Sequence, residues 1–188
     1  MTTLATKTRT VNDLDLDALD QVVDAIGRDP AAAMVAFRVT TDWGGQTRSR
    51  STVESYRIGG NEVPRRFTIE ADEPVELLGS NRAPNPQELL MSALNACMMV
   101  GYVAQAAVRG ITLDACRIET SGELDLRGFL GLDDEVPPGY RQLNYTVHIK
   151  GNGTPEQYAE IHQAVMKTSP NYFNMARPIR MNGTLSLD

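Results

Sequence analysis

The sequence predicts an α+β protein, and three observations support this fold class. Strand patterns, in which apolar and polar residues alternate, come both before and after one long apolar stretch at residues 85–110 that is typical of a helix. A second helical pattern follows near the C-terminus, and a last strand pattern closes the chain. Strands and helices thus come in blocks, as in antiparallel sheets combined with a few helices. A chain of 188 residues can bury one hydrophobic core.

The stretch 85–110 carries helix signals at both ends. Asn85 suits the N-cap, Pro86 suits the first helical position, and Glu88 can reach back to the cap as in a capping box. Gly110 supplies the left-handed residue that commonly ends a helix. The sequence therefore predicts one long helix between these residues.

No charged residue occurs between Leu89 and Val108, so we expect this helix to be buried on nearly every face. Its length would also allow it to cross a bilayer. Ser92, Asn95 and Gln105 would be costly in lipid, however. A central helix wrapped by sheets is therefore favoured over a membrane span.

Ala93, Cys97 and Gly101 recur at four-residue spacing and give the helix a stripe of small side chains. We expect something to come close there, whether a second helix, a strand or a ligand. From the helix alone, Cys97 is interpreted as a small buried core residue, because free cysteine is among the most buried residue types.

The main domain is expected to cover residues 34–188, preceded by a segment at residues 1–33. Residues 1–12 are polar and threonine-rich and predict a loose tail. Between residues 13 and 27, apolar side chains at helical spacing predict a short amphipathic helix.

Seven further strands and helices are predicted within the main domain. An antiparallel meander of three strands precedes the long helix, with turns at Gly44-Gly45 and at Gly59-Gly60. Its strands are expected at residues 34–43, 48–58 and 66–70. After the long helix we expect strands at 112–126 and 142–150 around a long loop at 127–140, a helix at 154–168, a short turn at 169–175 and a closing strand at 178–187.

Composition limits the function classes. The net charge of −6 argues against a nucleic-acid partner and against docking on an anionic membrane. Two cysteines are too few for a disulfide scaffold and fit a reducing compartment, and the N-terminus has no apolar signal core, so a cytoplasmic protein is expected. His148 and His162 are isolated and have no ligand spacing, so neither a metal nor a cofactor is expected.

The helix start Asn85-Pro86-Gln87-Glu88-Leu89-Leu90 and the pair Ala96-Cys97 resemble the OsmC/Ohr family, the osmotically inducible and organic-hydroperoxide-resistance proteins. Ser169-Pro170 stands where that family has a Cys-Pro pair. The resemblance covers roughly residue 34 to the C-terminus. It implies an OsmC-like α+β fold, with antiparallel sheets wrapped around a long central helix in an intertwined homodimer.

The resemblance also implies a chemistry. In the hydroperoxide-reducing relatives a thiolate attacks the peroxide, a second cysteine captures the sulfenic acid as a disulfide, and an external thiol reductant restores the enzyme. Cys97 matches the attacking position, whereas Ser169 at the resolving position cannot form a disulfide. The family's thiolate is assisted by an arginine from the early hairpin; Arg48 is the first choice here and Arg50 the alternative.

The family's glutamate, which holds that arginine, directly follows the helix-start proline, and this position is Gln87 here. Glu88 is one step further, which rotates its side chain by about 100°, so it is expected to act as a cap. Gln87 could still hydrogen-bond an arginine, without a charge. Gln87 and Cys97 lie about 15 Å apart along one helix, so a site that uses both would be shared between two chains.

Two functions remain open from the sequence. The first is a thiol-dependent peroxidase that reduces organic hydroperoxides through Cys97. The alternative is a non-enzymatic family member that binds a small apolar ligand at the dimer interface, with Cys97 as part of the lining. Cys116, the only other cysteine, is interpreted as an inward-facing strand residue and not as a substitute resolving thiol.

Overall fold

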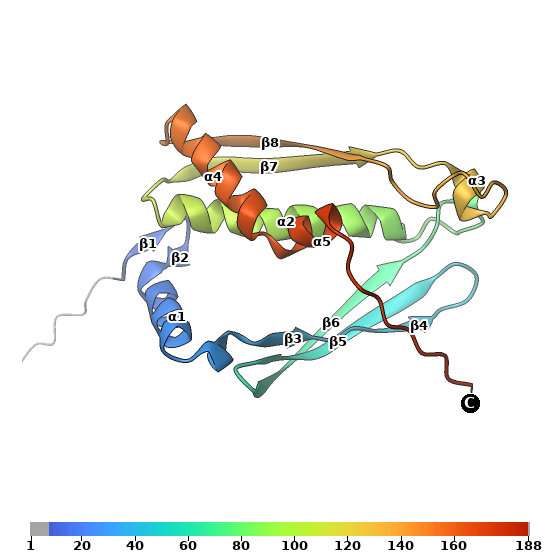
Figure 1. The fold of residues 1–188 in the computed structure, drawn as a ribbon, viewed down its shortest axis with the longest axis horizontal. Helices are drawn as coiled ribbons and strands as arrows, with labels where there is room; N and C mark the ends of the chain where they lie inside the picture. Colours follow the sequence, from blue (N-terminus) through green and yellow to red (C-terminus); the bar gives the residue numbers. More distant parts are fainter. Residues whose placement is uncertain (1–7, 188) are drawn as a thin grey trace, which may run out of the picture. The chain divides into compact units, whose positions relative to one another are not determined.

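The computed structural model describes residues 8–187 and divides into two compact units, Met1–Leu90 and Met91–Asp188 (Figure 1). Residues 1–7 of the predicted tail lie outside the described residues. The division falls near the start of the long helix α2 (Pro86–Ala107).

The first unit begins with a small hairpin, which corrects the prediction of a loose tail up to residue 12. Strand β1 (Thr10–Val11) pairs antiparallel with β2 (Leu14–Asp15). Asn12 and Asp13 form the two-residue turn at φ values of 53° and 60°, a conformation that asparagine and aspartate tolerate well.

Helix α1 (Leu16–Arg28) confirms the predicted amphipathic helix. Asp15 is its N-cap, and the carboxylate accepts a hydrogen bond of 2.9 Å from the Ala18 N–H. A 3-10 helix, Pro30–Ala33, then leads into the sheet.

The predicted three-stranded meander is confirmed, with one correction. The central strand β5 (Ser49–Ile58) pairs antiparallel with β6 (Asn61–Ala71) on one side. On its other side the predicted strand 34–43 is interrupted and forms two pieces, β3 (Val35–Phe37) and β4 (Thr40–Trp43). The turn between β5 and β6 uses the two predicted glycines, both at positive φ.

Asp72 follows β6 and organises the loop that leads to α2. Its side chain is buried and accepts five hydrogen bonds of 2.8–3.2 Å. Burial by itself raises the pKa of Asp72, but the hydrogen bonds together outweigh it and lower that pKa to about 2. The donors are the hydroxyls of Thr47 and Ser80 and the backbone N–H groups of Glu73, Ser80 and Arg82.

We expect Asp72 to make the stability of the first unit depend on pH. Because its pKa is lowered from 3.8 to about 2 in the folded state, its contribution is complete above pH 4 and is lost as the pH falls towards 2. Urea unfolding followed by the fluorescence of Trp43, the single tryptophan, measures this stability between pH 2 and 6. Asp72→Asn should flatten the loss, whereas the exposed Asp134→Asn should not. Equal pH slopes for the native protein and Asp72→Asn would contradict the assignment.

Helix α2 has the predicted ends. The Glu88 N–H donates to Asn85 Oδ1 and the Asn85 N–H donates to Glu88 Oε2, both at 2.8 Å, so the capping box is formed. After the last helical residue, Gly110 has a φ of +70°, and the Ile111 N–H donates to the Ala106 carbonyl.

The prediction that α2 is buried on nearly every face is wrong within this chain. The helix buries one stripe at four-residue spacing, whereas Val100 is 70% exposed. By length and composition α2 is apolar enough to cross a membrane. Its buried stripe is the centre of the second unit's core. The stripe consists of Leu94, Met98, Tyr102 and Ala106.

The second unit covers α2 from two sides. Strands β7 (Leu113–Gly122) and β8 (Leu143–Gly151) form an antiparallel pair along one side of the helix, and α4 (Pro155–Thr168) crosses it on another (Figure 1). Helix α5 (Pro170–Ala176) follows α4 after a single residue. The predicted loop at 127–140 contains the last residues of a short helix, α3 (Leu126–Phe129).

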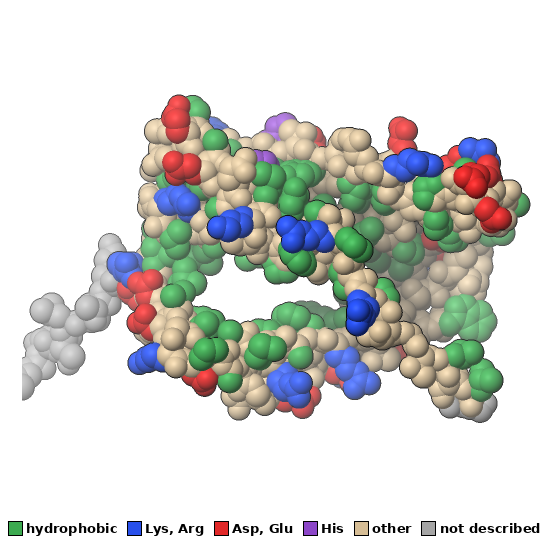
Figure 2. All heavy atoms as spheres, in the orientation of Figure 1, with side chains coloured by type: hydrophobic (Ala, Val, Ile, Leu, Met, Phe, Trp, Pro, Cys, Tyr) green, Lys and Arg blue, Asp and Glu red, His purple; other side chains and the backbone are tan. Residues whose placement is uncertain are grey.

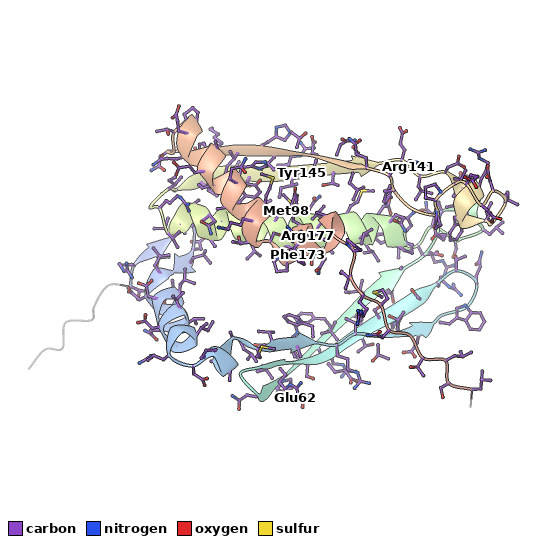
Figure 3. The ribbon with its side chains drawn as sticks, in the orientation of Figure 1. Glu62, Met98, Arg141, Tyr145, Phe173 and Arg177 are labelled. Atoms are coloured by element: carbon purple, nitrogen blue, oxygen red, sulfur yellow. The ribbon has the colours of Figure 1, made fainter. Side chains whose placement is uncertain are left out.

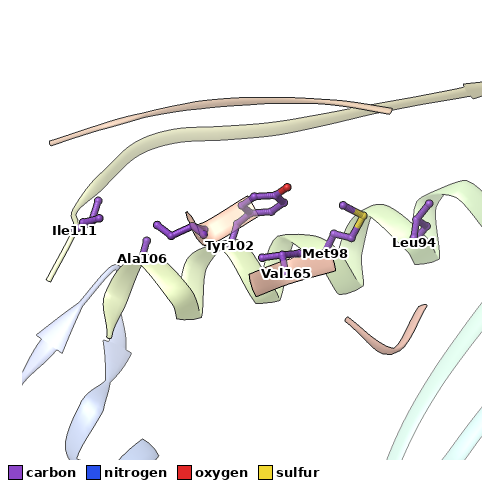
Figure 4. Close-up of a cluster of buried hydrophobic side chains, with 7 residues drawn as sticks. Leu94, Met98, Tyr102, Ala106, Ile111 and Val165 are labelled. Atoms are coloured by element: carbon purple, nitrogen blue, oxygen red, sulfur yellow. The ribbon is translucent and has the colours of Figure 1, made fainter. Parts of the chain in front are cut away.

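The core of the second unit joins these elements (Figure 4). Ile111 closes one end of the α2 stripe, and Ile161 and Val165 of α4 pack against it. Inward residues of β7 and β8 complete the cluster, among them Tyr145, Val147 and Ile149. His148, which alternates with these residues along β8, is exposed.

The predicted closing strand at 178–187 is not formed. A strand needs a neighbour for its backbone hydrogen bonds, and within residues 8–187 no strand pairs with this segment. Apolar side chains lie at the surface near this end of the chain (Figure 2). The large ones are 53–86% exposed: Ile179, Met181, Leu185 and Leu187.

Candidate functional site

Cys97 lies in the middle of α2 and is half-buried. The small stripe on which it lies is contacted by α4 and α5 of the same chain and by Ser169 between them, so a second helix is what comes close. At Gly101, an added Cβ would lie only 3.2 Å from the two methyl groups of Val165. These contacts lie at Gly101 and Cys97, while the side chain of Ala93 stays exposed within this chain.

Ser169 contacts the sulfur of Cys97. Its side chain is 5% exposed, and Oγ donates a hydrogen bond of 3.4 Å to Cys97 Sγ. The same oxygen accepts from the Tyr172 N–H at 3.3 Å, because Ser169 is the N-cap of α5. Since Oγ accepts from the backbone, its proton is available for the sulfur. A hydroxyl in this position stabilises negative charge on sulfur.

Two asparagines that the sequence analysis did not assign to the site fix α2 around Cys97. Asn171 Nδ2, from α5, donates to the carbonyl of Ala93 at 2.8 Å, one turn before the cysteine. Asn95 accepts from the Thr120 hydroxyl at 2.5 Å and donates to the Ile118 carbonyl at 3.4 Å, which ties the helix to β7. For Asn95 the sequence held one signal of such a role, a polar amide in a stretch without charged residues.

The two hairpin arginines lie in the first unit and differ in their surroundings. Arg50 forms an ion pair with Glu70 at 2.7 Å across β5 and β6. Arg48 lies just before β5, beside the Gly45 turn, and makes no ion pair within residues 8–187. Both line a cavity of about 610 Å³ that also involves Arg82 and Asp72.

Gln87 is the second residue of α2. Within the described part of the first unit, no hydrogen bond joins it to Arg48 or Arg50. Glu88 caps the helix, as expected. The structure therefore brings Cys97 and Ser169 together in the second unit, while the roles of Arg48 and Gln87, in the first unit, remain predictions.

Cys116 has the surroundings of a structural cysteine. It is half-buried, packs against the core, and burial raises the pKa of its thiol. A raised pKa leaves little reactive thiolate at neutral pH. Within residues 8–187 no three His, Cys, Asp or Glu side chains come together as a metal site would need.

Comparison with solved structures finds the same fold in several bacterial proteins. An OsmC-like protein from Mycoplasma pneumoniae is 17% identical, with a TM-score of 0.57 over 74% of this chain and 86% of that one. A protein from Psychrobacter arcticus, provisionally assigned to the osmotic-stress and detoxification response, is 16% identical, with a TM-score of 0.54 over 72% and 85%. An OsmC-like protein of unknown function from Vibrio cholerae is 14% identical, with a TM-score of 0.51 over 74% and 93%.

Among curated proteins no match was found. The sequence profile of the OsmC-like proteins matches residues 79–182, which include α2, Cys97 and Ser169. This match covers more than half of the chain, and the solved structures have the same α+β arrangement of antiparallel sheets and one long helix. The chain therefore belongs to the OsmC-like protein family.

Proposed function

We propose that the protein is a thiol-dependent peroxidase that reduces organic hydroperoxides through Cys97. The observation that carries the proposal is the contact between the Ser169 hydroxyl and the Cys97 sulfur. A half-buried cysteine that receives a hydrogen bond from a buried donor is equipped to carry negative charge, unlike an ordinary core cysteine. Membership of the OsmC-like family supports the same chemistry.

The reaction proceeds through the sulfur in balanced steps. The Cys97 thiolate attacks the terminal oxygen of the hydroperoxide, the O–O bond breaks, and the remaining alkoxide leaves with a proton as an alcohol. Cys97 becomes a sulfenic acid, oxidised by two electrons. The Ser169 hydroxyl is positioned to hydrogen-bond the thiolate before the attack and the sulfenic acid after it.

Recovery requires an external small thiol, because Ser169 provides no second sulfur and Cys116 packs in the core. The thiol condenses with the sulfenic acid to a mixed disulfide and releases water. A second thiol then attacks the external sulfur of this mixed disulfide, which frees Cys97 and leaves the disulfide of the two small thiols as product.

Ser169→Cys tests both the reactivity of Cys97 and the position of residue 169. With one equivalent of cumene hydroperoxide and no added thiol, the native protein should give a sulfenic acid on Cys97, trapped by a dimedone probe and found by mass spectrometry. The variant should instead give a disulfide between Cys97 and the introduced thiol, because residue 169 already contacts the sulfur.

Thr168→Cys is the matched control. Residue 168 directly precedes residue 169, and its hydroxyl donates to the Ala164 carbonyl. This variant should form no such disulfide. If Cys97 of the native protein stays reduced at a hydroperoxide concentration that oxidises free cysteine, the peroxidase proposal fails.

We also propose that the protein is a homodimer. Two apolar surfaces of the second unit support this. Val100 on α2 is 70% exposed, and the unpaired segment 178–187 exposes large apolar side chains. Exposed apolar surface of this kind is typical of protein interfaces.

A further inference from the structure

A second cavity lies in the second unit, between α2, β8 and α4, and has a volume of about 490 Å³. This is within the range of small-molecule sites. Cys97 and Tyr102 are five positions apart on α2, which places them about 140° apart around the helix axis, so this cavity opens on a different face from Cys97. Its lining is largely aromatic: Tyr102, Tyr145, Tyr158 and His162, with Val147 and Ile149.

The hydrogen bond between Tyr102 and His162 determines the protonation of the imidazole. The Tyr102 side chain leaves α2 towards β7 and β8 and is 1% exposed (Figure 4). Its hydroxyl lies 2.5 Å from His162 Nδ1, its one hydrogen-bond partner among the described residues. A buried hydroxyl that did not donate its proton would lose a hydrogen bond. Tyr102 therefore donates and Nδ1 accepts.

This places the imidazole proton on Nε2 in neutral His162. Burial, and then the neighbouring Tyr145 and Cys116, raise the pKa of Tyr102, so its hydroxyl keeps its proton at physiological pH. Within residues 8–187 the Nε2–H group has no hydrogen-bond partner. His162 thus has one donor left unused.

Two neighbouring rings hold His162 in place. Tyr102 meets the imidazole end-on through its hydroxyl, with a centroid distance of 6.1 Å, and Tyr145, labelled in Figure 3, packs at the same distance with a tilt of 39°. The Tyr158 hydroxyl already accepts from the Gly153 N–H at 3.1 Å. The cavity therefore combines flat aromatic walls with one fixed donor, an arrangement suited to a flat ligand with one acceptor.

We infer that this cavity binds a small planar aromatic molecule that carries one hydrogen-bond-accepting oxygen, such as an aryl ketone. The ring of the ligand packs against the tyrosines, and its oxygen accepts from His162 Nε2. This site does not use Cys97 and is independent of the peroxidase reaction proposed above.

Acetophenone and ethylbenzene test the inference, because they have nearly the same size and differ in the carbonyl oxygen. Titrations followed by NMR of the full-length protein should show saturable shifts of Tyr102, Tyr145 and His162 signals with acetophenone. Ethylbenzene should bind roughly 3- to 10-fold more weakly, the difference expected for one neutral hydrogen bond. Equal affinities, or shifts elsewhere in the protein, would overturn the inference.

Four variants sharpen the test. His162→Phe keeps an aromatic ring but removes the donor, so it should abolish the preference for acetophenone. Ala159→Leu fills the cavity, which Ala159 lines, and should weaken both ligands, whereas Gln163→Leu on the exposed side of α4 should weaken neither. Cys97→Ser should bind both ligands as the native protein does. Unchanged binding in Ala159→Leu would also overturn the inference.

Discussion

The Cys97→Ser variant is expected to lose more than about 100-fold of the activity towards an organic hydroperoxide. A serine hydroxyl stays protonated at neutral pH and cannot form a sulfenic acid, so neither the attack on the peroxide oxygen nor the mixed disulfide is possible. The measurement is the consumption of cumene hydroperoxide in the presence of dithiothreitol, after subtraction of the reaction without protein.

Cys116→Ser is the matched control for this loss. The substitution removes the other thiol of the chain but leaves Cys97 and Ser169 in contact, so the activity should remain within about 3-fold of the native value. The comparison separates reaction at one residue from general oxidation of thiols. Activity that survives Cys97→Ser, or that disappears equally in Cys116→Ser, would exclude Cys97 as the reacting group.

Met181→Asp is expected to convert the proposed homodimer into a monomer. Met181 is 86% exposed in the single chain, so the substitution should leave the folded chain intact. In an apolar interface, however, the carboxylate would lose its water and find no partner, which costs several kcal/mol. Light scattering at micromolar concentration should then show a fall from twice the chain mass of 20.6 kDa to that mass itself.

Asn182→Asp adds the same charge at the next position, where the native side chain is already polar. It should therefore remain dimeric. A native protein that is monomeric at this concentration would contradict the proposed dimer. If Met181→Asp stays dimeric, the interface does not include the C-terminal segment.

The ends of the helices could be predicted from the sequence, because the interactions that form them are local. Asn85 and Glu88 cap each other at the start of α2, and Thr154 forms the corresponding capping box with Gln157 at the start of α4. Gly110 has the left-handed conformation that ends the long helix. Partners in each case lie within a few residues, so the sequence alone contains the information.

Elements that depend on a distant neighbour were predicted less well. Residues 178–187 have an alternating pattern, yet they form no strand, because alternation describes the faces of a strand and not the neighbour to which it bonds. Helix α2, which has no charged residue after Glu88, was predicted to be buried on nearly every face, whereas the second unit of the chain buries one stripe of it. Val100 lies outside this stripe and is therefore exposed.

In the candidate site, too, local features could be predicted from the sequence and long-range contacts could not. The sequence by itself determined that Cys97 lies in mid-helix, and the resemblance predicted that Ser169 stands at the position of a family cysteine, because both depend on local motifs. Only the tertiary structure decided that these two residues, 72 positions apart, are in contact at 3.4 Å. It also decided that Asn171 holds α5 on α2 and that Tyr102 fixes the proton of His162. Such pairings depend on how α4 and α5 pack across α2, and this packing is set by volume and hydrogen bonding between distant segments, which no local pattern records.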